Sequence, residues 1–311
     1  MRYGVALPNY GSLATPDALV QLARRAERLG IDSVWVSDHL VAPTSVRSRY
    51  PYDRRPDAPP GDMGVIEHFY EPLVTLAYLA GATSTVRLGV SAYVVPYRPP
   101  VVTAKQVATL DVLSRGRLVL AVGVGWLREE FEALGVPFEG RGRRTDEYLA
   151  LCRALWTDEV ARYDGTTVRL PPVRTGPKPL QRPHPPLWVA GNSAAARARA
   201  ACVGQGWHAI DLAPAELAPL AADLRRRVAA AGRAPDEVAV SLRKGILVGD
   251  PPRGEPHPLY GGPSAIRADL AAYAAAGCNY LVLGVRGPRS VEAFEHALDE
   301  IASVLSDGPE G

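Results

Sequence analysis

The sequence predicts one (β/α)8 barrel of the TIM type, an α/β fold, and three features of the chain support it. Short apolar runs alternate with longer segments of helical periodicity, which is typical of parallel βαβ units. Eight such pairs follow at even spacing, and eight units close a barrel. A doubly wound sheet is the alternative, but even spacing favours closure. With 47% hydrophobic and 22% charged residues, the chain can form a single domain over residues 1–311.

The first unit shows how each element is recognised. Residues 2–7 form a β-like run, and Thr15 can cap a helix that begins at Pro16, where proline loses no hydrogen bond. Leucine and alanine then recur at helical spacing until Gly30, which is typical of a helix end. The second strand is expected at residues 33–37.

The remaining units repeat this alternation. Further strands are expected at residues 86–93, 118–122, 187–190, 207–212, 238–248 and 280–284. Helical patterns separate them at about residues 71–81, 100–114, 143–156, 193–203, 215–231, 264–276 and 290–305.

Three insertions interrupt the regular pattern, after the second, fourth and seventh strands. Residues 42–68 are rich in proline, arginine and aspartate, residues 160–184 resemble a small hairpin followed by proline-rich coil, and residues 249–262 are rich in proline and glycine. Loops that follow barrel strands form the active face, so long insertions there usually shape a substrate pocket. A decorative loop is the alternative, above all for residues 249–262.

The pair Asp38 and His39 directly follows the second expected strand. Barrel enzymes keep catalytic groups at the carboxyl ends of their strands, and histidine can donate or accept a proton near neutral pH. The alternative is a histidine satisfied by hydrogen bonds within its own loop. Its position favours the catalytic interpretation.

Three glycine-containing segments end other strands. Segments 88–93 and 122–126 allow close approach of the backbone to a flat ligand, although packing with small side chains explains them as well. Segment 122–126 is no dinucleotide fingerprint, because the third glycine is missing. Gly191, Asn192 and Ser193 lead into an alanine-rich helix, whose free N–H groups can hold a phosphate; an ordinary capped helix is the alternative.

Composition and missing motifs exclude several classes. The net charge of +2, with both signs interspersed, indicates neither nucleic acid nor a membrane surface as partner. No apolar run reaches membrane-spanning length, and the first residues lack a signal-peptide pattern. Three scattered cysteines favour a reducing compartment, and metallohydrolase, serine-hydrolase and P-loop motifs are missing. We expect a cytoplasmic enzyme that binds no metal and acts on a small molecule.

Taken together, these segments resemble the bacterial luciferase-like family, and within it the F420-dependent branch. The most specific match is KQVATLDVLS at residues 105–114, followed by Gly116 and Arg117. Other matches cover almost the whole chain in register. They are GVALPN (4–9), SVWVSDH (33–39), VPYR (95–98), GVGWL (123–127), EEF (129–131), RTDE (144–147), KP (178–179), PHPP (183–186) and GWH (206–208).

The resemblance implies a cofactor that lies across the carboxyl ends of the strands. His39 would be the proton donor or acceptor beside the reactive ring, with Asp38 as orienter or ring contact. A non-proline cis peptide would bulge beneath the ring at Ser91–Ala92, and Gly191, Asn192 and Ser193 would hold the cofactor phosphate. The implied cofactor contacts are Asp38, Val90, Ser91, Ala92, Gly123, Gly125, Gly191, Asn192 and Ser193.

Two departures from the family pattern refine this expectation. Trp126 stands where F420-dependent sugar-phosphate dehydrogenases carry a glutamate, which argues against sugar-phosphate oxidation. FMN-using members usually place near Gly142 a tyrosine that helps to hold the FMN phosphate, and its absence here favours F420. The expected reaction is hydride transfer between the deazaflavin and a small organic substrate.

Two other functions stay open. One is an FMN-dependent two-component monooxygenase of the same family, supplied with reduced flavin by a separate reductase and using O2. The other is a non-catalytic flavin-binding relative, against which the retained Asp38–His39 pair argues. Family analogy also implies a homodimer. The residues expected to line the substrate pocket are Tyr50, Tyr52, His68, Tyr93, Trp126 and Tyr260.

Overall fold

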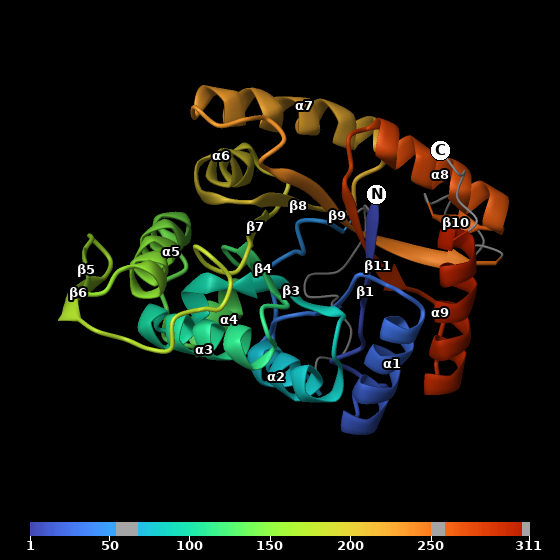
Figure 1. The fold of residues 1–311 in the computed structure, drawn as a ribbon, viewed down its shortest axis with the longest axis horizontal. Helices are drawn as coiled ribbons and strands as arrows, with labels where there is room; N and C mark the ends of the chain where they lie inside the picture. Colours follow the sequence, from blue (N-terminus) through green and yellow to red (C-terminus); the bar gives the residue numbers. More distant parts are fainter. Residues whose placement is uncertain (54–67, 250–258, 307–311) are drawn as a thin grey trace.

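Eight parallel strands close a barrel (Figure 1). The computed structural model describes residues 1–53, 68–249 and 259–306. Strand β9 pairs with both β8 and β11, and β11 pairs with β1, so the sheet closes on itself and confirms the predicted fold class. In spatial order the strands are β1 (Arg2–Ala6), β2 (Ser33–Val36), β3 (Arg87–Val94), β4 (Leu118–Gly123), β7 (Leu187–Ala190), β8 (Gly206–Ile210), β9 (Ala239–Val248) and β11 (Tyr280–Val285).

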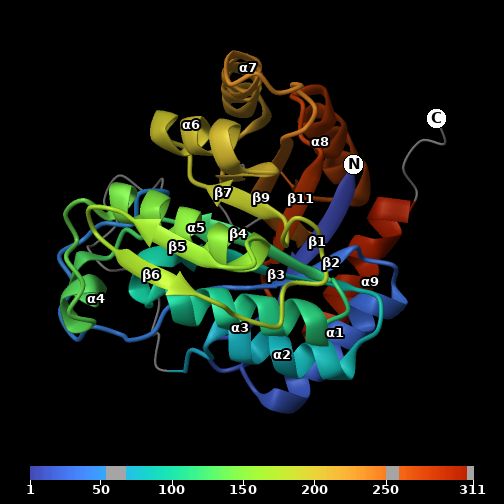
Figure 2. The same cartoon turned by 60° about the vertical axis from the view of Figure 1, so that its left-hand side comes forward.

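Helices surround the barrel, and the long ones follow the expected order (Figures 1 and 2). Thr15 and Ser193 cap α1 and α6 through side-chain oxygens, as serine and threonine commonly do. Among the described residues, no helix combines the length and the apolar character that crossing a membrane requires. The helices are α1 (Pro16–Arg28), α2 (Pro72–Ala82), α3 (Pro100–Leu113), α4 (Arg128–Ala133), α5 (Arg141–Thr157), α6 (Ala194–Val203), α7 (Pro214–Ala230), α8 (Pro263–Ala275) and α9 (Val291–Ser306).

Short elements account for the differences from the prediction. Helix α4 and the 3-10 turn η1 (Val95–Tyr97) were not predicted, because a few residues are too few to establish a helical period. The insertion at 160–184 contains the predicted hairpin, formed by β5 (Ala161–Asp164) and β6 (Arg169–Val173). The last insertion contributes β10 (Tyr260–Gly261), which pairs with the end of β9. The parts of the other insertions at 54–67 and 250–258 lie outside the described residues.

Two tryptophans fill the interior of the barrel. The rings of Trp35 and Trp188 lie 5.4 Å apart, and both side chains are buried. Glycines on the neighbouring strands leave space for these two rings. A Cβ at Gly89 would lie 2.3 Å from Trp35, and a Cβ at Gly206 would lie 2.5 Å from Trp188. The barrel is therefore a packed core, and a ligand must bind at its mouth.

Candidate active site

The floor of the barrel mouth is formed by inward side chains near the strand ends. Arg243 of β9 donates from Nη1 to the carbonyl oxygen of Ser91 at 2.6 Å and to Oγ of Ser37 at 3.1 Å. Ser91 belongs to β3, and Ser37 directly follows β2. One guanidinium thus connects three strands at the end where barrel enzymes place their chemistry.

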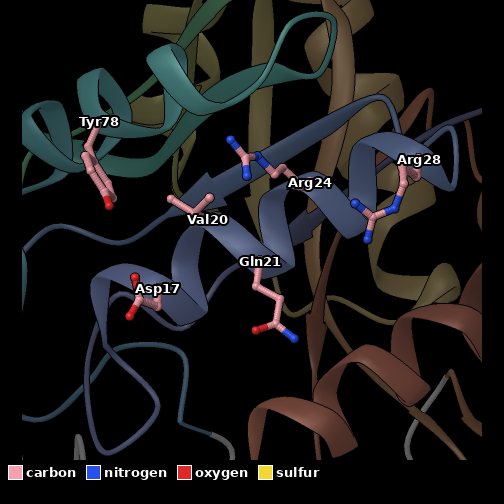
Figure 3. A pocket seen from close by; sticks show the side chains of 6 residues that line it. All are labelled: Asp17, Val20, Gln21, Arg24, Arg28 and Tyr78. Atoms are coloured by element: carbon pink, nitrogen blue, oxygen red, sulfur yellow. The ribbon is translucent and has the colours of Figure 1, made fainter.

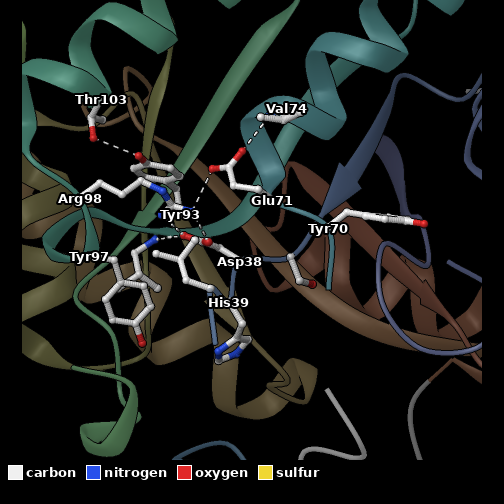
Figure 4. A network of polar contacts seen from close by, with 12 residues as sticks. Asp38, His39, Tyr70, Glu71, Val74, Tyr93, Tyr97, Arg98 and Thr103 are labelled. Atoms are coloured by element: carbon white, nitrogen blue, oxygen red, sulfur yellow. Dashed lines mark hydrogen bonds and ion pairs between the residues drawn. The ribbon is translucent and has the colours of Figure 1, made fainter. Parts of the chain in front are cut away.

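Asp38 is held in a buried ion pair at this end (Figure 4). Its two carboxylate oxygens accept hydrogen bonds from Arg98 at 2.8 and 2.9 Å, and the backbone N–H of Val94 donates a third at 2.8 Å. Arg98 also donates to Glu71 at 2.9 Å and lies over the ring of Tyr93. Because both oxygens of Asp38 are engaged, this geometry favours the orienting role over direct contact with a cofactor ring.

The side chain of His39 contacts other residues than that of Asp38. Its Nδ1 lies 2.6 Å from Oε2 of Glu130, and its ring meets Phe69 and Trp126 edge-on at centroid distances of 5.3 and 6.5 Å. Its Nε2 forms no hydrogen bond with any residue in the described part of the chain. One nitrogen is thus anchored, and the other can exchange a proton with a ligand.

Glu130, on the short helix α4, is a site residue that the sequence analysis missed. Its side chain is fully buried, and besides His39 it accepts hydrogen bonds from the Tyr97 hydroxyl at 2.8 Å and the backbone N–H of Leu40 at 2.6 Å. Burial by itself would raise the pKa of Glu130, but the hydrogen bonds, led by that of His39, hold it below its ordinary value. The EEF match at 129–131 was the available signal, but it does not tell which glutamate turns inward.

The peptide bond between Ser91 and Ala92 is cis, as the family resemblance implied. The pairing of β3 with β4 shifts register between Ser91 and Tyr93. From inside the barrel, His208 supports this segment: its Nε2 lies 2.8 Å from Oγ of Ser91, and its Nδ1 lies 2.9 Å from Oγ of Ser241. Burial and the nearby Arg243 lower the pKa of His208 to about 3, so this imidazole is neutral.

The turn from β7 into α6 forms a cradle lined by backbone groups. Gly191 has a φ of +115°, a conformation that glycine adopts at little cost. The side chain of Asn192 is occupied by two bonds to the backbone of Ile210, at 2.7 and 2.9 Å, so Asn192 shapes the turn. Ser193 caps α6, and a first helical turn leaves N–H groups without partners inside the helix, here those of Ala194 and Ala195. Such groups suit a phosphate.

Tyr52 reaches the same turn from the insertion after β2. Burial raises the pKa of Tyr52, and the nearby backbone N–H of Asn192 opposes that rise; a Cβ on Gly191 would lie 3.1 Å from the Tyr52 hydroxyl. A phenol therefore stands at the cradle, although the chain has no tyrosine near Gly142.

The other predicted cofactor contacts fall into two groups. Gly123 lies at the mouth, where a Cβ would meet the Cβ of Ala92 at 3.4 Å. Gly125 has a φ of +80°, and a Cβ there would lie 2.6 Å from Phe131, so this turn needs glycine for its own packing. Val90 is fully buried in the main hydrophobic core. Gly125 and Val90 thus support the mouth, and Gly123 and Ala92 line it.

Aromatic rings surround His39. Besides its contact with His39, Trp126 meets Tyr50 at a centroid distance of 5.2 Å, and Tyr50 meets Tyr52 at 5.3 Å. On the other side, Tyr10 stacks on Phe69 at 5.0 Å. The rings form an apolar wall around the imidazole.

The other residues expected to line the substrate pocket are placed differently. Tyr93 is fully buried, and its hydroxyl lies 3.0 Å from Oγ1 of Thr103 on α3, away from His39. His68 is exposed, and its carbonyl accepts a hydrogen bond from Gly11. The hydroxyl of Tyr260 lies over Gly245 of β9, 3.0 Å from where a Cβ would stand.

A separate pocket of about 370 Å³ lies on the outer helix layer. Figure 3 shows that its lining side chains come from one exposed face of α1, joined by Tyr78 of α2. It contains none of the residues predicted for the site. We therefore take the barrel mouth, not this pocket, as the candidate active site.

The chain belongs to the luciferase-like monooxygenase family, whose family model matches residues 1–280. The barrel, the cis peptide of β3 and the histidine after β2 agree with the resemblance that the sequence showed. This is a family of oxidoreductases, with members and structural neighbours that use F420 or a flavin.

The chain is similar to uncharacterized and flavin-dependent relatives, and its fold is similar to solved structures that include an F420-dependent enzyme. An uncharacterized protein of Mycobacterium tuberculosis is 36% identical over 193 residues, covering 61% of this chain but only 64% of that relative. The FMNH2-dependent dimethylsulfone monooxygenase of Pseudomonas putida is 33% identical over 165 residues, covering 52% and 45%. Among solved structures, a monooxygenase of Streptomyces bottropensis superposes with a TM-score of 0.80 at 21% identity, covering 98% and 99% of the two chains. An F420-dependent secondary alcohol dehydrogenase reaches 0.76 at 19%, covering 97% of each chain.

Proposed function

We propose that the protein is an F420-dependent oxidoreductase that transfers a hydride between the deazaflavin and a small organic substrate. The observation that carries the proposal is a histidine with one open nitrogen, His39, at the same barrel mouth as a backbone cradle for a phosphate. Bound F420 would supply the hydride chemistry. His39 would give or take the accompanying proton at Nε2, and Asp38 would hold the segment after β3 in place through Arg98.

The residues at the cradle fit the phosphate of such a cofactor. Gly191 adds no side chain of its own beside the Tyr52 hydroxyl, and the N–H groups of Ala194 and Ala195 at the start of α6 suit a bound anion. The positive end of the helix dipole also favours negative charge there. The cis peptide at Ser91–Ala92 and Gly123 would lie beneath the ring.

A group of arginines next to the cradle favours F420 over FMN. The first turn of α5 holds Arg141, Arg143 and Arg144 and no acidic residue, although a helix N-terminus disfavours positive charge. Burial and the neighbouring Arg128 lower the pKa of Arg141, as expected where cations crowd together. Arg199 of α6 donates to the carbonyl of Gly142 at 3.2 Å, which places the two helices side by side. F420 extends beyond its phosphate into a chain of carboxylates, whereas FMN ends at its phosphate.

A comparison of cofactor affinities tests the proposal. Purified protein is titrated with F420 and separately with FMN under identical conditions, and fluorescence is followed. We expect tight binding of F420 and weak binding of FMN, after which F420-linked oxidation or reduction of small alcohols and carbonyl compounds can be assayed. A preference for FMN would contradict the proposal, and binding of neither would remove the cofactor argument.

The second candidate is an FMN-dependent monooxygenase that receives reduced flavin from a separate reductase. The Tyr52 hydroxyl at the cradle favours it, because a phenol near the FMN phosphate is what the family resemblance associates with FMN. Turnover with a flavin reductase and O2, together with a preference for FMN, would support this candidate. A protein that binds FMN but turns over in neither assay would be the non-catalytic relative.

A further inference from the structure

A buried acid, Glu130, stands beside His39 and has no part in the proton transfer described above. Glu130 has no exposed side-chain surface, yet it carries an ionisable group directly behind His39. Burial of an unpaired charge is costly, so such a group persists where donors surround it. Its partners therefore indicate which protonation state the site imposes.

The donors around Glu130 fix it as a carboxylate that only accepts hydrogen bonds. Oε1 accepts from the backbone N–H groups of Leu40 and Val41, at 2.6 and 3.3 Å, and these two groups can only donate. Oε2 lies 2.8 Å from the hydroxyl of Tyr97 and 2.6 Å from Nδ1 of His39. An ionised carboxylate has no proton to give, so Nδ1 must be the donor in the bond to His39.

We infer that Glu130 is a positioning residue that holds His39 in the tautomer with the proton on Nδ1. The lone pair of the neutral imidazole then lies on Nε2, the nitrogen that bonds to no described residue. In this tautomer His39 is prepared to accept a proton from a substrate, and in its charged form it can return one. Only the exchange of a proton with a substrate rests on the proposed function; the tautomer of His39 does not.

The other charged and titratable groups nearby do not compete for His39. Asp38 is bonded to Arg98 and Val94, and Arg98 is shared with Glu71. Tyr97, from η1, donates to Glu130 itself. The tautomer of His39 therefore depends on one carboxylate.

Nitrogen-15 NMR of the cofactor-free full chain tests the inference, since the protonated and the bare imidazole nitrogen resonate far apart. The His39 signals are identified by their loss in His39→Asn, and the spectra are recorded above the range in which the imidazole is charged. We expect the proton on Nδ1 in the wild-type protein. A proton on Nε2 would overturn the inference without any variant having to fold.

The variant Glu130→Gln tests the cause. Its amide oxygen must stay with the two loop N–H donors, so its NH2 group turns to His39, and Nδ1 becomes an acceptor. We therefore expect the tautomer to invert, with the proton on Nε2. Glu129→Gln is the matched control: it removes the same charge from the adjacent position, where the carboxylate bonds to Arg47 and Ser48, and it should leave the tautomer unchanged. An unchanged tautomer in Glu130→Gln would refute the inference.

Turnover adds a second measurement, once a substrate is known. Glu130→Gln should lower kcat by about 100-fold or more while KM stays close to its wild-type value, and adding it to His39→Asn should cause no further loss. Additive losses would mean that Glu130 acts independently of His39. Because the NMR experiment uses no cofactor, failure of the F420 proposal would leave the tautomer result intact.

Discussion

At the scale of single residues, two neighbours in the chain have opposite surroundings. Both oxygens of Asp38 accept hydrogen bonds from Arg98 or Val94, so its carboxylate holds these two residues in place. His39, one residue further on, keeps one nitrogen without a described partner beside Trp126 and Phe69. The pair therefore divides into an anchor and a proton carrier, and two substitutions can separate these roles.

Replacing His39 with asparagine should lower turnover with little change in cofactor affinity. Asparagine cannot exchange a proton near neutral pH, and general acid–base catalysis contributes about 10²- to 10⁴-fold. The measurements are kcat and the Kd of F420. His296→Asn, an exposed histidine on α9, is the control and should behave as wild type. Unchanged turnover in His39→Asn would remove this residue from the mechanism.

Replacing Asp38 with asparagine should instead destabilise the fold. The change leaves a buried guanidinium that, among the described residues, has Glu71 as its one remaining acidic partner, and breaking a buried pair costs about 3 kcal/mol in the free energy of unfolding. Urea unfolding measures this loss. Asp164→Asn removes an exposed pair with Arg169 and should cost about 1 kcal/mol or less. Equal stability of the two variants would contradict the anchoring role.

At the scale of elements, the start of α5 is the least expected feature. Three arginines occupy a helical turn whose dipole disfavours them, and Arg143 is exposed and forms no ion pair with the described residues. Arg199 of α6 bonds to the carbonyl of Gly142, so the start of α5 lies beside α6. We propose that these arginines border the cradle and meet negative charge beyond a bound phosphate.

The substitution Arg143→Glu should weaken F420 binding more than FMN binding. Reversal of an exposed charge changes binding by roughly 1 kcal/mol, or about fivefold in Kd, and salt reduces the effect. Fluorescence titrations at low and high salt measure it. Arg28→Glu, on α1 at another side of the barrel, is the control. An equal loss of affinity for F420 and for FMN would argue that Arg143 does not contact the carboxylate chain that only F420 carries.

The elements that the sequence predicted are those with a strong period and clear ends. Helix α1 has its cap at Thr15, its first proline and its apolar stripe, so local signals were sufficient. Glu130 was not predicted as a site residue, because its burial depends on contacts between α4, η1 and the loop after β2, and no local sequence pattern encodes such contacts. Tyr93 was predicted to line the substrate pocket, but it is buried beside Thr103, after a shift in the register of β3 with β4. Periodicity cannot foresee such a shift.

At the scale of the molecule, the outer face of α2 and α3 is unusually apolar. Val74 and Tyr78 are 65% and 50% exposed on α2, and Val101, Val102 and Leu113 are 45%, 47% and 64% exposed on α3. The two helices lie side by side in Figures 1 and 2. Exposed apolar side chains gathered on two neighbouring helices are typical of an interaction surface. We propose that a second copy of the chain covers it, in the symmetric manner usual for homodimers.

The variant Val102→Glu should convert this dimer into a monomer. A charge at the centre of an apolar interface, met by its symmetry mate, is strongly unfavourable. Light scattering coupled to size-exclusion chromatography measures the molecular mass of the wild-type protein and of Val102→Glu. Val160→Glu, an equally exposed valine outside α2 and α3, should remain dimeric. A monomeric wild-type protein would contradict the proposed face.

The aromatic wall around His39 also gives the molecule a natural optical reporter. Of the five tryptophans, Trp35, Trp156, Trp188 and Trp207 are at most 5% exposed, whereas Trp126 is partly exposed at the mouth. Tryptophan fluorescence should therefore fall when a conjugated ring arrives, both through contact with Trp126 and through energy transfer from the deeper indoles. Occupancy of the barrel can then be followed in real time without a label, and Trp126→Phe separates the contribution of Trp126 from that of the other four.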